Sequence, residues 1–98
     1  MAVKFGVLAL LEAKPDKSDD LAELLQSARS LAAAEKGTVT WYAFKVDDTT
    51  YGIFDTFESP EARNAHLEGE IPAALASLGP DLLGKDPDIR LVEIVAVK

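Results

Sequence analysis

The sequence predicts an α+β domain whose secondary structure elements follow the order β-α-β-β-α-β. Three observations lead to this prediction: apolar residues alternate as in strands in four segments, they recur at helical spacing in two regions between those segments, and turn or capping residues separate them. A chain of 98 residues is expected to form one domain over residues 1–98, since no linker, internal repeat or low-complexity tract divides it.

The first two predicted elements are a strand over residues 3–12 and a helix that begins at Ser18 or Asp19. Apolar residues occupy both faces of the strand, which favours cover on both sides. In the helix, leucine and alanine recur at positions i, i+3, i+4 and i+7, which is typical of an amphipathic helix. Lys36 marks its last turn, and Gly37 is placed to end it as the C′ residue.

A β-hairpin is predicted next. Residues 39–46 (VTWYAFKV) are rich in β-branched and aromatic side chains, and residues 51–57 (YGIFDTF) form the returning strand after a short acidic turn. Because side chains alternate between the two faces of a strand, Trp41 lies on one face, and Tyr42 and Phe44 lie on the other.

Two helical pieces and a strand complete the predicted order. The Ser-Pro-Glu sequence at 59–61 is typical of a helix start, with serine as N-cap and proline in the first turn. This short helix is expected to run to about Glu68, and a second piece to cover residues 71–83 with an interruption by the Gly-Pro pair at 79–80. The apolar alternation of residues 89–97 predicts the last strand.

With its helices on one face of an antiparallel sheet, this order is that of the ferredoxin-like plait. The other face of the sheet keeps many apolar residues, and a large exposed apolar patch usually marks an interface. We therefore expect a homodimer in which two copies pack sheet against sheet. The alternative is that residues such as Lys45 and Asp55 make the open face polar enough for a monomer.

The composition excludes several classes of protein. The chain has 10 Lys and Arg against 17 Asp and Glu, a net charge of −7, which argues against nucleic acid as a partner. The absence of cysteine excludes a disulfide scaffold and a thiolate metal site. The longest apolar run is too short to span a membrane, and the first residues do not resemble a signal peptide, so a cytoplasmic location is expected.

Several stretches of the chain resemble the antibiotic biosynthesis monooxygenase (ABM) family. They are WYAF at 41–44, YGIFDTF at 51–57, SPEARNAHLEG at 59–69 and the closing strand from residue 89 onward. The resemblance implies a dimeric α+β barrel of two plaits, with a pocket between sheet and helices in each protomer. It also implies a range of activities, since relatives include cofactor-independent monooxygenases of aromatic phenols, quinol oxygenases and haem-degrading enzymes.

His66, the single histidine, is the candidate catalytic residue. A phenol or quinol must lose its hydroxyl proton before it transfers electrons to oxygen, and an imidazole can act there as base or as hydrogen-bond donor. The alternative is a half-buried histidine that caps its helix or bonds to a strand residue.

Trp41, Tyr42 and Tyr51 are the candidate substrate-binding residues, because their rings and phenol groups suit a flat aromatic ligand. The alternative is that these aromatic side chains belong to the core and to cross-strand pairs. Arg63 and Asn64 are expected to be exposed to solvent.

The sequence argues against two kinds of chemistry. With one histidine and no cysteine, and with carboxylates mostly at turns and helix starts, no metal site is predicted. In the haem-degrading relatives an asparagine on the first strand belongs to the catalytic set, whereas the corresponding strand here carries Lys4, Phe5 and Gly6.

Two functional hypotheses follow. The first is an ABM-like homodimer that oxidises a small electron-rich aromatic molecule, a phenol or quinol, without a bound cofactor, so that the substrate itself supplies the electrons. The second is a non-catalytic module of the same fold that binds a small ligand or only dimerises.

Overall fold

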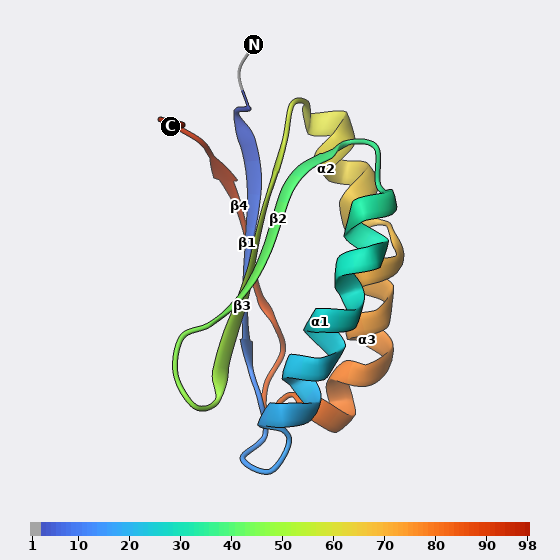
Figure 1. The fold of residues 1–98 in the computed structure, drawn as a ribbon, viewed down its shortest axis with the longest axis vertical. Coiled ribbons are helices and arrows are strands. Elements are labelled where there is room, and N and C mark those ends of the chain that lie inside the picture. Colours follow the sequence, from blue (N-terminus) through green and yellow to red (C-terminus); the bar gives the residue numbers. More distant parts are fainter. Residues whose placement is uncertain (1–2) are drawn as a thin grey trace.

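The computed structural model describes residues 3–98 and confirms the predicted α+β class and the ferredoxin-like order (Figure 1). Within these residues four strands form one antiparallel sheet, and the helices lie against one of its faces. The elements are β1 (Phe5–Glu12), α1 (Ser18–Ala34), β2 (Thr38–Lys45), β3 (Thr50–Phe57), α2 (Pro60–Leu67), α3 (Glu70–Leu82) and β4 (Asp88–Glu93). In this part of the chain no helix combines the length and apolar character needed to cross a membrane.

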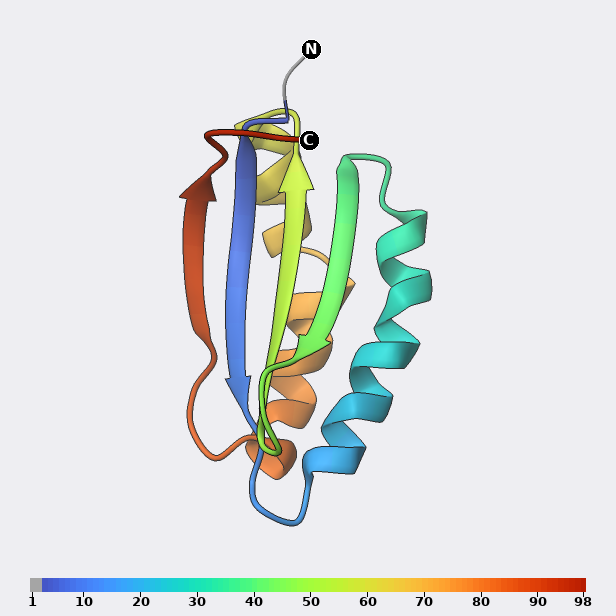
Figure 2. The same ribbon diagram turned by 60° about the vertical axis from the view of Figure 1, so that its left-hand side comes forward.

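The strand order β2-β3-β1-β4 places β1 and β3 in the middle of the sheet and the other two strands at its edges (Figure 2). Ala9 of β1 lies opposite Ile53 of β3 in the register, and both side chains are buried. Because side chains alternate between faces, the odd-numbered residues of the two central strands point toward the helices and the even-numbered residues point away.

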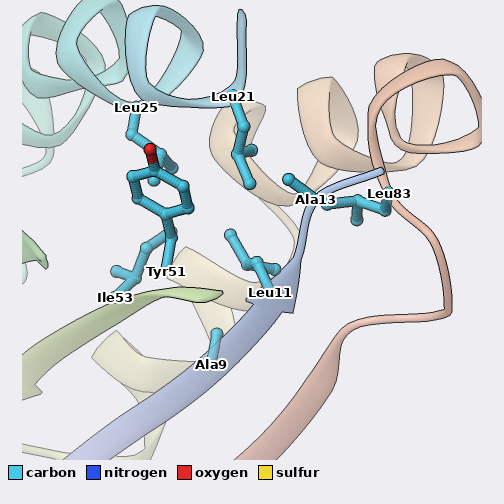
Figure 3. Close-up of a cluster of buried hydrophobic side chains, with 8 residues drawn as sticks. All are labelled: Ala9, Leu11, Ala13, Leu21, Leu25, Tyr51, Ile53 and Leu83. Carbon is cyan, nitrogen blue, oxygen red and sulfur yellow. The ribbon is translucent and has the colours of Figure 1, made fainter. Parts of the chain in front are cut away.

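The core lies between the sheet and the helices. Leu11, Leu21 and Phe57 are among its fully buried side chains. The larger cluster of buried residues joins β1, α1, β3 and the end of α3; its members are Ala9, Leu11, Ala13, Leu21, Leu25, Tyr51, Ile53 and Leu83 (Figure 3). Full burial of one leucine side chain stabilises the fold by about 1.5–3 kcal/mol, so this cluster fixes α1 against the central strands.

Helix α1 forms where it is predicted, but it ends earlier. Its buried residues follow the predicted apolar stripe, and Asp19 and Asp20 lie in its first turn, where the helix dipole favours negative charge. The helix ends at Ala34, and Glu35 adopts an extended conformation. The predicted role of Gly37 in ending the helix is therefore wrong. The Glu35 side chain is hydrogen-bonded to Thr38 and His66, and these contacts accompany the departure of the backbone from helical geometry two residues before Gly37.

Two helices follow β3, as predicted. The Ser59 hydroxyl oxygen accepts a hydrogen bond from the Ala62 amide over 3.1 Å, and Pro60 opens α2. Gly69 separates α2 from α3. The predicted interruption of α3 is wrong, since the helix continues through Pro80 to its end at Leu82. A proline this close to the helix end removes one hydrogen bond from the last turn, and its fixed φ suits the helix.

The first and last strands are shorter than predicted. β1 begins at Phe5 rather than at residue 3, and β4 ends at Glu93 rather than at residue 97. Phe5 and Glu93 lie opposite each other in the register, so the ladder stops for both strands at the same place. One further hydrogen bond, from the Ile94 amide to the Lys4 carbonyl, extends the contact beyond the strands.

The sheet face that points away from the helices carries apolar side chains across β2, β3 and β1, whereas β4 places Arg90 opposite Leu8 and Asp88 opposite Leu10. Tyr42 of edge strand β2 lies opposite Phe54 of β3, which in turn lies opposite Leu8 of β1. In the next row, Phe44 lies opposite Gly52, which faces Leu10. Tyr42 is 61% exposed, so this open face presents a continuous apolar surface to solvent in the isolated chain.

Lys45 and Asp55 do not lie on this open face. The expectation that they could make it polar enough for a monomer is therefore wrong. Both are odd-numbered residues whose register partners point toward the helices. The Lys45 ammonium lies 5.9 Å from the centre of the Tyr51 ring, and Asp55 is buried beneath the helices. These two charges therefore contribute nothing to the polarity of the open face.

Candidate active site

A cavity of about 590 Å³ lies between the sheet and helices α2 and α3. Its walls are largely apolar, and the loop between α3 and β4 borders it. The lining residues are Val7, Ala9, Ile53, Asp55, His66, Leu67, Ile71, Pro72, Leu75, Ala76, Gly79, Pro80, Leu83, Gly84, Lys85, Asp86, Pro87 and Ile89. Cavities of this size and composition are typical of sites for small organic ligands.

Two polar side chains, Asp55 and His66, meet in this apolar wall. Asp55 lies on the helix-facing side of β3 and is 1% exposed, and His66 lies on α2 and is 6% exposed. The imidazole Nε2 of His66 is 2.9 Å from Oδ2 of Asp55. The Phe57 ring lies beside the imidazole, with the two ring centres 5.3 Å apart. The pair is therefore shielded from water and strongly coupled.

The other imidazole nitrogen faces a second carboxylate, that of Glu35. Nδ1 of His66 is 2.7 Å from Oε1 of Glu35, and the Thr38 hydroxyl donates to the same oxygen over 2.6 Å. Glu35 is 22% exposed, so it lies closer to solvent than the other two side chains. We refer to Asp55, His66 and Glu35 together as the acid–imidazole row.

The row favours the protonated form of His66. Burial by itself lowers the pKa of the imidazole, but the hydrogen bonds to Asp55 and Glu35 and the negative charges of both carboxylates outweigh burial. The pKa of His66 is therefore raised above the 6.5 of an ordinary histidine. In that form both ring nitrogens donate, and the two carboxylates leave the row with an excess negative charge.

Oδ1 of Asp55 is buried and has no hydrogen-bond partner among residues 3–98. A buried acceptor without a donor costs about 1–3 kcal/mol. Asp55 also lines the cavity, so a ligand hydroxyl or N–H group that reached this oxygen would satisfy it. The arrangement can thus hold an apolar ring against its walls and orient the ring through one hydrogen bond.

The three aromatic candidates line a different depression. Trp41, Tyr42 and Tyr51 border a groove of about 640 Å³ between α1 and the edge strand β2, and among the described residues none of the three lines the cavity that contains His66. Tyr51 is buried in the core (Figure 3). Its hydroxyl lies 2.9 Å from the Ser18 hydroxyl at the start of α1. The structure therefore does not bring His66 and these aromatic residues together around one space.

Trp41 is the aromatic candidate nearest to the acid–imidazole row in the sheet. It lies directly opposite Asp55 in the register of β2 and β3, on the helix-facing side. Its Nε1 is buried and has no partner in the described part of the chain. Trp41 and the cavity residue Leu75 also pack against the same small cluster of buried residues. Trp41 therefore lies next to the acid–imidazole row in the sheet but does not line the cavity.

Sequence reasoning did not identify Asp55 or Glu35 as site residues. The signal for Asp55 was present, since it is the one charged residue among the odd-numbered, otherwise apolar or aromatic positions of YGIFDTF. Glu35 carried no such signal, because its role depends on the folded position of His66, 31 residues away.

The two residues near His66 that were expected to be exposed differ from each other. Asn64 is exposed, as expected. The prediction for Arg63 is wrong, since this side chain is half-buried. Its guanidinium stacks over the Phe5 ring at 5.4 Å and donates hydrogen bonds to two main-chain carbonyls, one in β1 and one in β4. Among residues 3–98, no group of three or more histidine, cysteine, aspartate or glutamate side chains is arranged to hold a metal ion.

Comparison with known proteins agrees with this fold and with the resemblance in sequence. Residues 4–74 match the family described as antibiotic biosynthesis monooxygenase (ABM). A protein of unknown function from Nitrosomonas europaea, NE2512, is 44% identical, with a TM-score of 0.96 over 98% of this chain and 93% of that chain. No curated protein matches the chain.

Two more distant structures share the fold. PA3566 from Pseudomonas aeruginosa is 17% identical, with a TM-score of 0.83 over 98% of both chains. Rv0793 from Mycobacterium tuberculosis is 18% identical, with a TM-score of 0.84 over 96% of this chain and 97% of that chain. Given the match over residues 4–74, the chain belongs to the antibiotic biosynthesis monooxygenase family.

Proposed function

We propose that the chain is a monooxygenase that oxidises a small electron-rich aromatic molecule, a phenol or a quinol, without a bound cofactor. The observation that carries this proposal is the buried Asp55–His66 pair in the wall of a largely apolar cavity. Membership of the ABM family supports a monooxygenase-type reaction. The polar pair supplies the proton transfer that such a reaction needs.

In this proposal the substrate ring lies against the apolar walls of the cavity, including Ile71 and Leu75, and its hydroxyl donates to Oδ1 of Asp55. This position satisfies the one buried carboxylate oxygen that has no partner in the described chain. It also places the hydroxyl proton next to a row of groups that carries excess negative charge. The row can therefore accept that proton.

An anthrone-type phenol illustrates the electron balance. Transfer of its proton to the row leaves an anion that is electron-rich enough to reduce O₂. At the oxidised carbon, two hydrogen atoms are replaced by one oxygen atom, and the second oxygen atom leaves as water. One O₂ is consumed for each carbonyl formed, and the substrate is the only reductant.

The proposed role of His66 is that of a hydrogen-bond donor that holds Asp55 and shares the proton, since both ring nitrogens are engaged with carboxylates. Among the aromatic candidates, Trp41 lies opposite Asp55 but does not line the cavity, so its proposed part in substrate binding concerns a ligand held in the neighbouring groove. The same holds for Tyr42 and Tyr51.

The test measures oxygen uptake by metal-stripped protein that is given hydroquinones and anthrone-type phenols. We expect uptake above background for at least one substrate, and a loss of about 100-fold or more in kcat for His66→Ala and Asp55→Asn. Asn64→Ala, an exposed position on the same helix as His66, is the matched control and should retain activity. Equal background rates for all four proteins on every substrate would rule out the enzyme.

The second candidate function is a non-catalytic module that binds a small ligand. The observation in its favour is that the His66 ring has no nitrogen free to act as a base toward a ligand, because carboxylates engage both. Fluorescence of Trp41, the single tryptophan, can report binding beside Asp55. Saturable quenching by a phenol without oxygen uptake supports the binding module, whereas quenching together with uptake supports the enzyme.

We also infer that two copies pair through the open face of the sheet. Tyr42, Phe44, Phe54, Leu8 and Leu10 form the apolar part of that face. Removing such a surface from water stabilises association by about 25 cal/mol for each Å² of apolar area buried. The partner in this proposal is therefore a second copy of the chain, with a small aromatic molecule as the ligand.

A further inference from the structure

We propose that Glu35 is a positioning residue, which holds the His66 ring in place and connects the buried Asp55–His66 pair to solvent. This inference rests on the proposed function and adds a residue to it. It starts from the order of burial along the acid–imidazole row. Asp55 at the cavity is 1% exposed, His66 is 6% exposed, and Glu35 is 22% exposed.

Short contacts join the row without a gap. His66 lies 2.9 Å from Asp55 through one ring nitrogen and 2.7 Å from Glu35 through the other. A proton that enters at Asp55 can thus be matched by a proton that leaves at Glu35, with the imidazole ring between them. Because the ring is held on both sides, it cannot rotate away from Asp55 without breaking a charge-assisted hydrogen bond.

Glu35 is itself held in place by two neighbouring segments. The Thr38 hydroxyl at the start of β2 donates to the same carboxylate oxygen that faces His66. On the other side, the backbone at Gly69 between α2 and α3 approaches so closely that a Cβ there would lie 3.3 Å from Oε2 of Glu35. The carboxylate therefore sits where the end of α1, the start of β2 and the α2–α3 junction meet.

The charged groups around His66 favour this role. Asp55 faces it from β3, and Glu35 faces it from the end of α1. On α2 itself, Arg63 directs its guanidinium to main-chain carbonyls of β1 and β4. Removal of the Glu35 charge leaves His66 with one carboxylate, while burial still opposes its charged form.

A purely structural role for Glu35, as a tether between α1 and α2, makes a different prediction. A tether contributes to stability, but the protonation of His66 and the pH dependence of turnover would not depend on its charge. Glu35→Gln separates the two roles, because the amide keeps the size of the side chain and can still accept a hydrogen bond.

The experiment follows the ring nitrogens of His66 by NMR as a function of pH. Since the chain has one histidine, the signals are unambiguous. We expect the titration midpoint of Glu35→Gln to lie at lower pH than that of wild type, and Thr38→Val to move it in the same direction by less. Glu68→Gln, an exposed position two residues after His66, is the matched control and should titrate like wild type. A wild-type midpoint in Glu35→Gln overturns the proposal.

The same variants are then compared in oxygen uptake. For Glu35→Gln we expect kcat to fall by at least about 10-fold, KM to stay within about 2-fold, and the alkaline limb of the pH profile to move to lower pH. An unchanged kcat and pH profile leaves Glu35 as a tether and overturns the proposal. If wild type consumes no oxygen with any substrate, the proposed enzyme fails, and the NMR titration alone decides whether Glu35 positions His66.

Discussion

Asp55 and His66 explain each other at the scale of single residues. A carboxylate that is 1% exposed is stable in a core only when it is paired, and the imidazole provides the partner. The imidazole in turn is buried beside the Phe57 ring, and the carboxylates that face both of its nitrogens favour its charged form by raising its pKa. The pair is therefore expected to contribute to stability as well as to the proposed chemistry.

The raised pKa of His66 predicts how stability depends on pH. Hydrogen bonds to Asp55 and Glu35 favour the charged ring in the folded state. The folded protein therefore binds the imidazole proton more tightly than the unfolded chain does. This contribution is fully present below about pH 6.5, the ordinary histidine value, and is lost as pH rises through the higher folded-state pKa.

Urea unfolding of wild type and His66→Gln from pH 5.5 to 9 checks this expectation. The effects of the other titrating groups cancel in the difference between the unfolding free energies of the two proteins. The difference in unfolding free energy between the two proteins should shrink as pH rises. A difference that grows with pH would show that His66 is buried in its neutral form.

Loss of the Asp55 carboxylate should destabilise the fold more than loss of an exposed one. Asp55→Ala leaves Nε2 of the buried imidazole without an acceptor, while Glu35 still faces Nδ1, and breaking a buried charged pair typically costs about 3–5 kcal/mol. Asp81→Ala, on the exposed side of α3, is the control and should change the unfolding free energy by less than about 0.5 kcal/mol. Urea midpoints measured at pH 7 provide the comparison, and similar midpoints for the two variants would contradict a structural role for the pair.

At the scale of elements, a strand and a short helix place these two side chains. The alternation of β3 turns Asp55 toward the helices, on the same side as Ile53 and Phe57. Helix α2 has 8 residues, and His66 is its buried residue. Because so short a helix has little stability of its own, its start signal and its packing determine whether the imidazole reaches the sheet.

The N-cap of α2 should therefore contribute measurably to stability. Ser59→Ala removes the hydrogen bond to the Ala62 amide and should cost about 1 kcal/mol, whereas Ser59→Asp should restore most of it, since aspartate is also a good N-cap. Ser77→Ala, at an exposed position within α3, serves as the control. Thermal or urea unfolding measures the difference, and a Ser59→Ala protein as stable as wild type would mean that tertiary packing alone holds α2.

At the scale of the whole molecule, the sheet has helices on one face and an apolar surface on the other. The row from Tyr42 through Phe54 to Leu8 crosses three strands without a charged residue. Arg90 on β4 closes the row at the far edge. These side chains form one connected apolar surface rather than scattered exposed residues. Such a surface favours an interface with a second copy of the chain.

A charge in the middle of this surface should prevent pairing. Light scattering of wild type should give twice the 10.5 kDa of one chain, and Tyr42→Asp should give the mass of one chain. Leu78→Asp introduces the same charge at a leucine of α3 that is 41% exposed, and it should leave the mass unchanged. A wild-type mass near 10.5 kDa at micromolar concentration would contradict the dimer.

The fold could be predicted largely from local signals, and the site only in part. The order of elements and the start of α2 are encoded by short-range patterns, such as apolar spacing and the capping serine. Strand ends were less predictable, because β4 stops at Glu93 where its neighbour β1 ends, and that depends on pairing rather than on β-propensity. His66 is a candidate on sequence alone because it is the lone histidine, whereas nothing in the sequence pointed to Asp55 and Glu35 as its contacts.

The sequence by itself determined the class of fold, the family, and the presence of one titratable imidazole in an acidic chain. The tertiary structure alone decided which charges surround that imidazole. Asp55, His66 and Glu35 come from a strand, a helix and a helix end, and they meet because strand register and helix packing bring distant segments together. Contacts of this kind are long-range, so no local pattern along the chain encodes them. For the same reason, only the folded structure shows that Trp41, Tyr42 and Tyr51 line a groove separate from the cavity that contains His66.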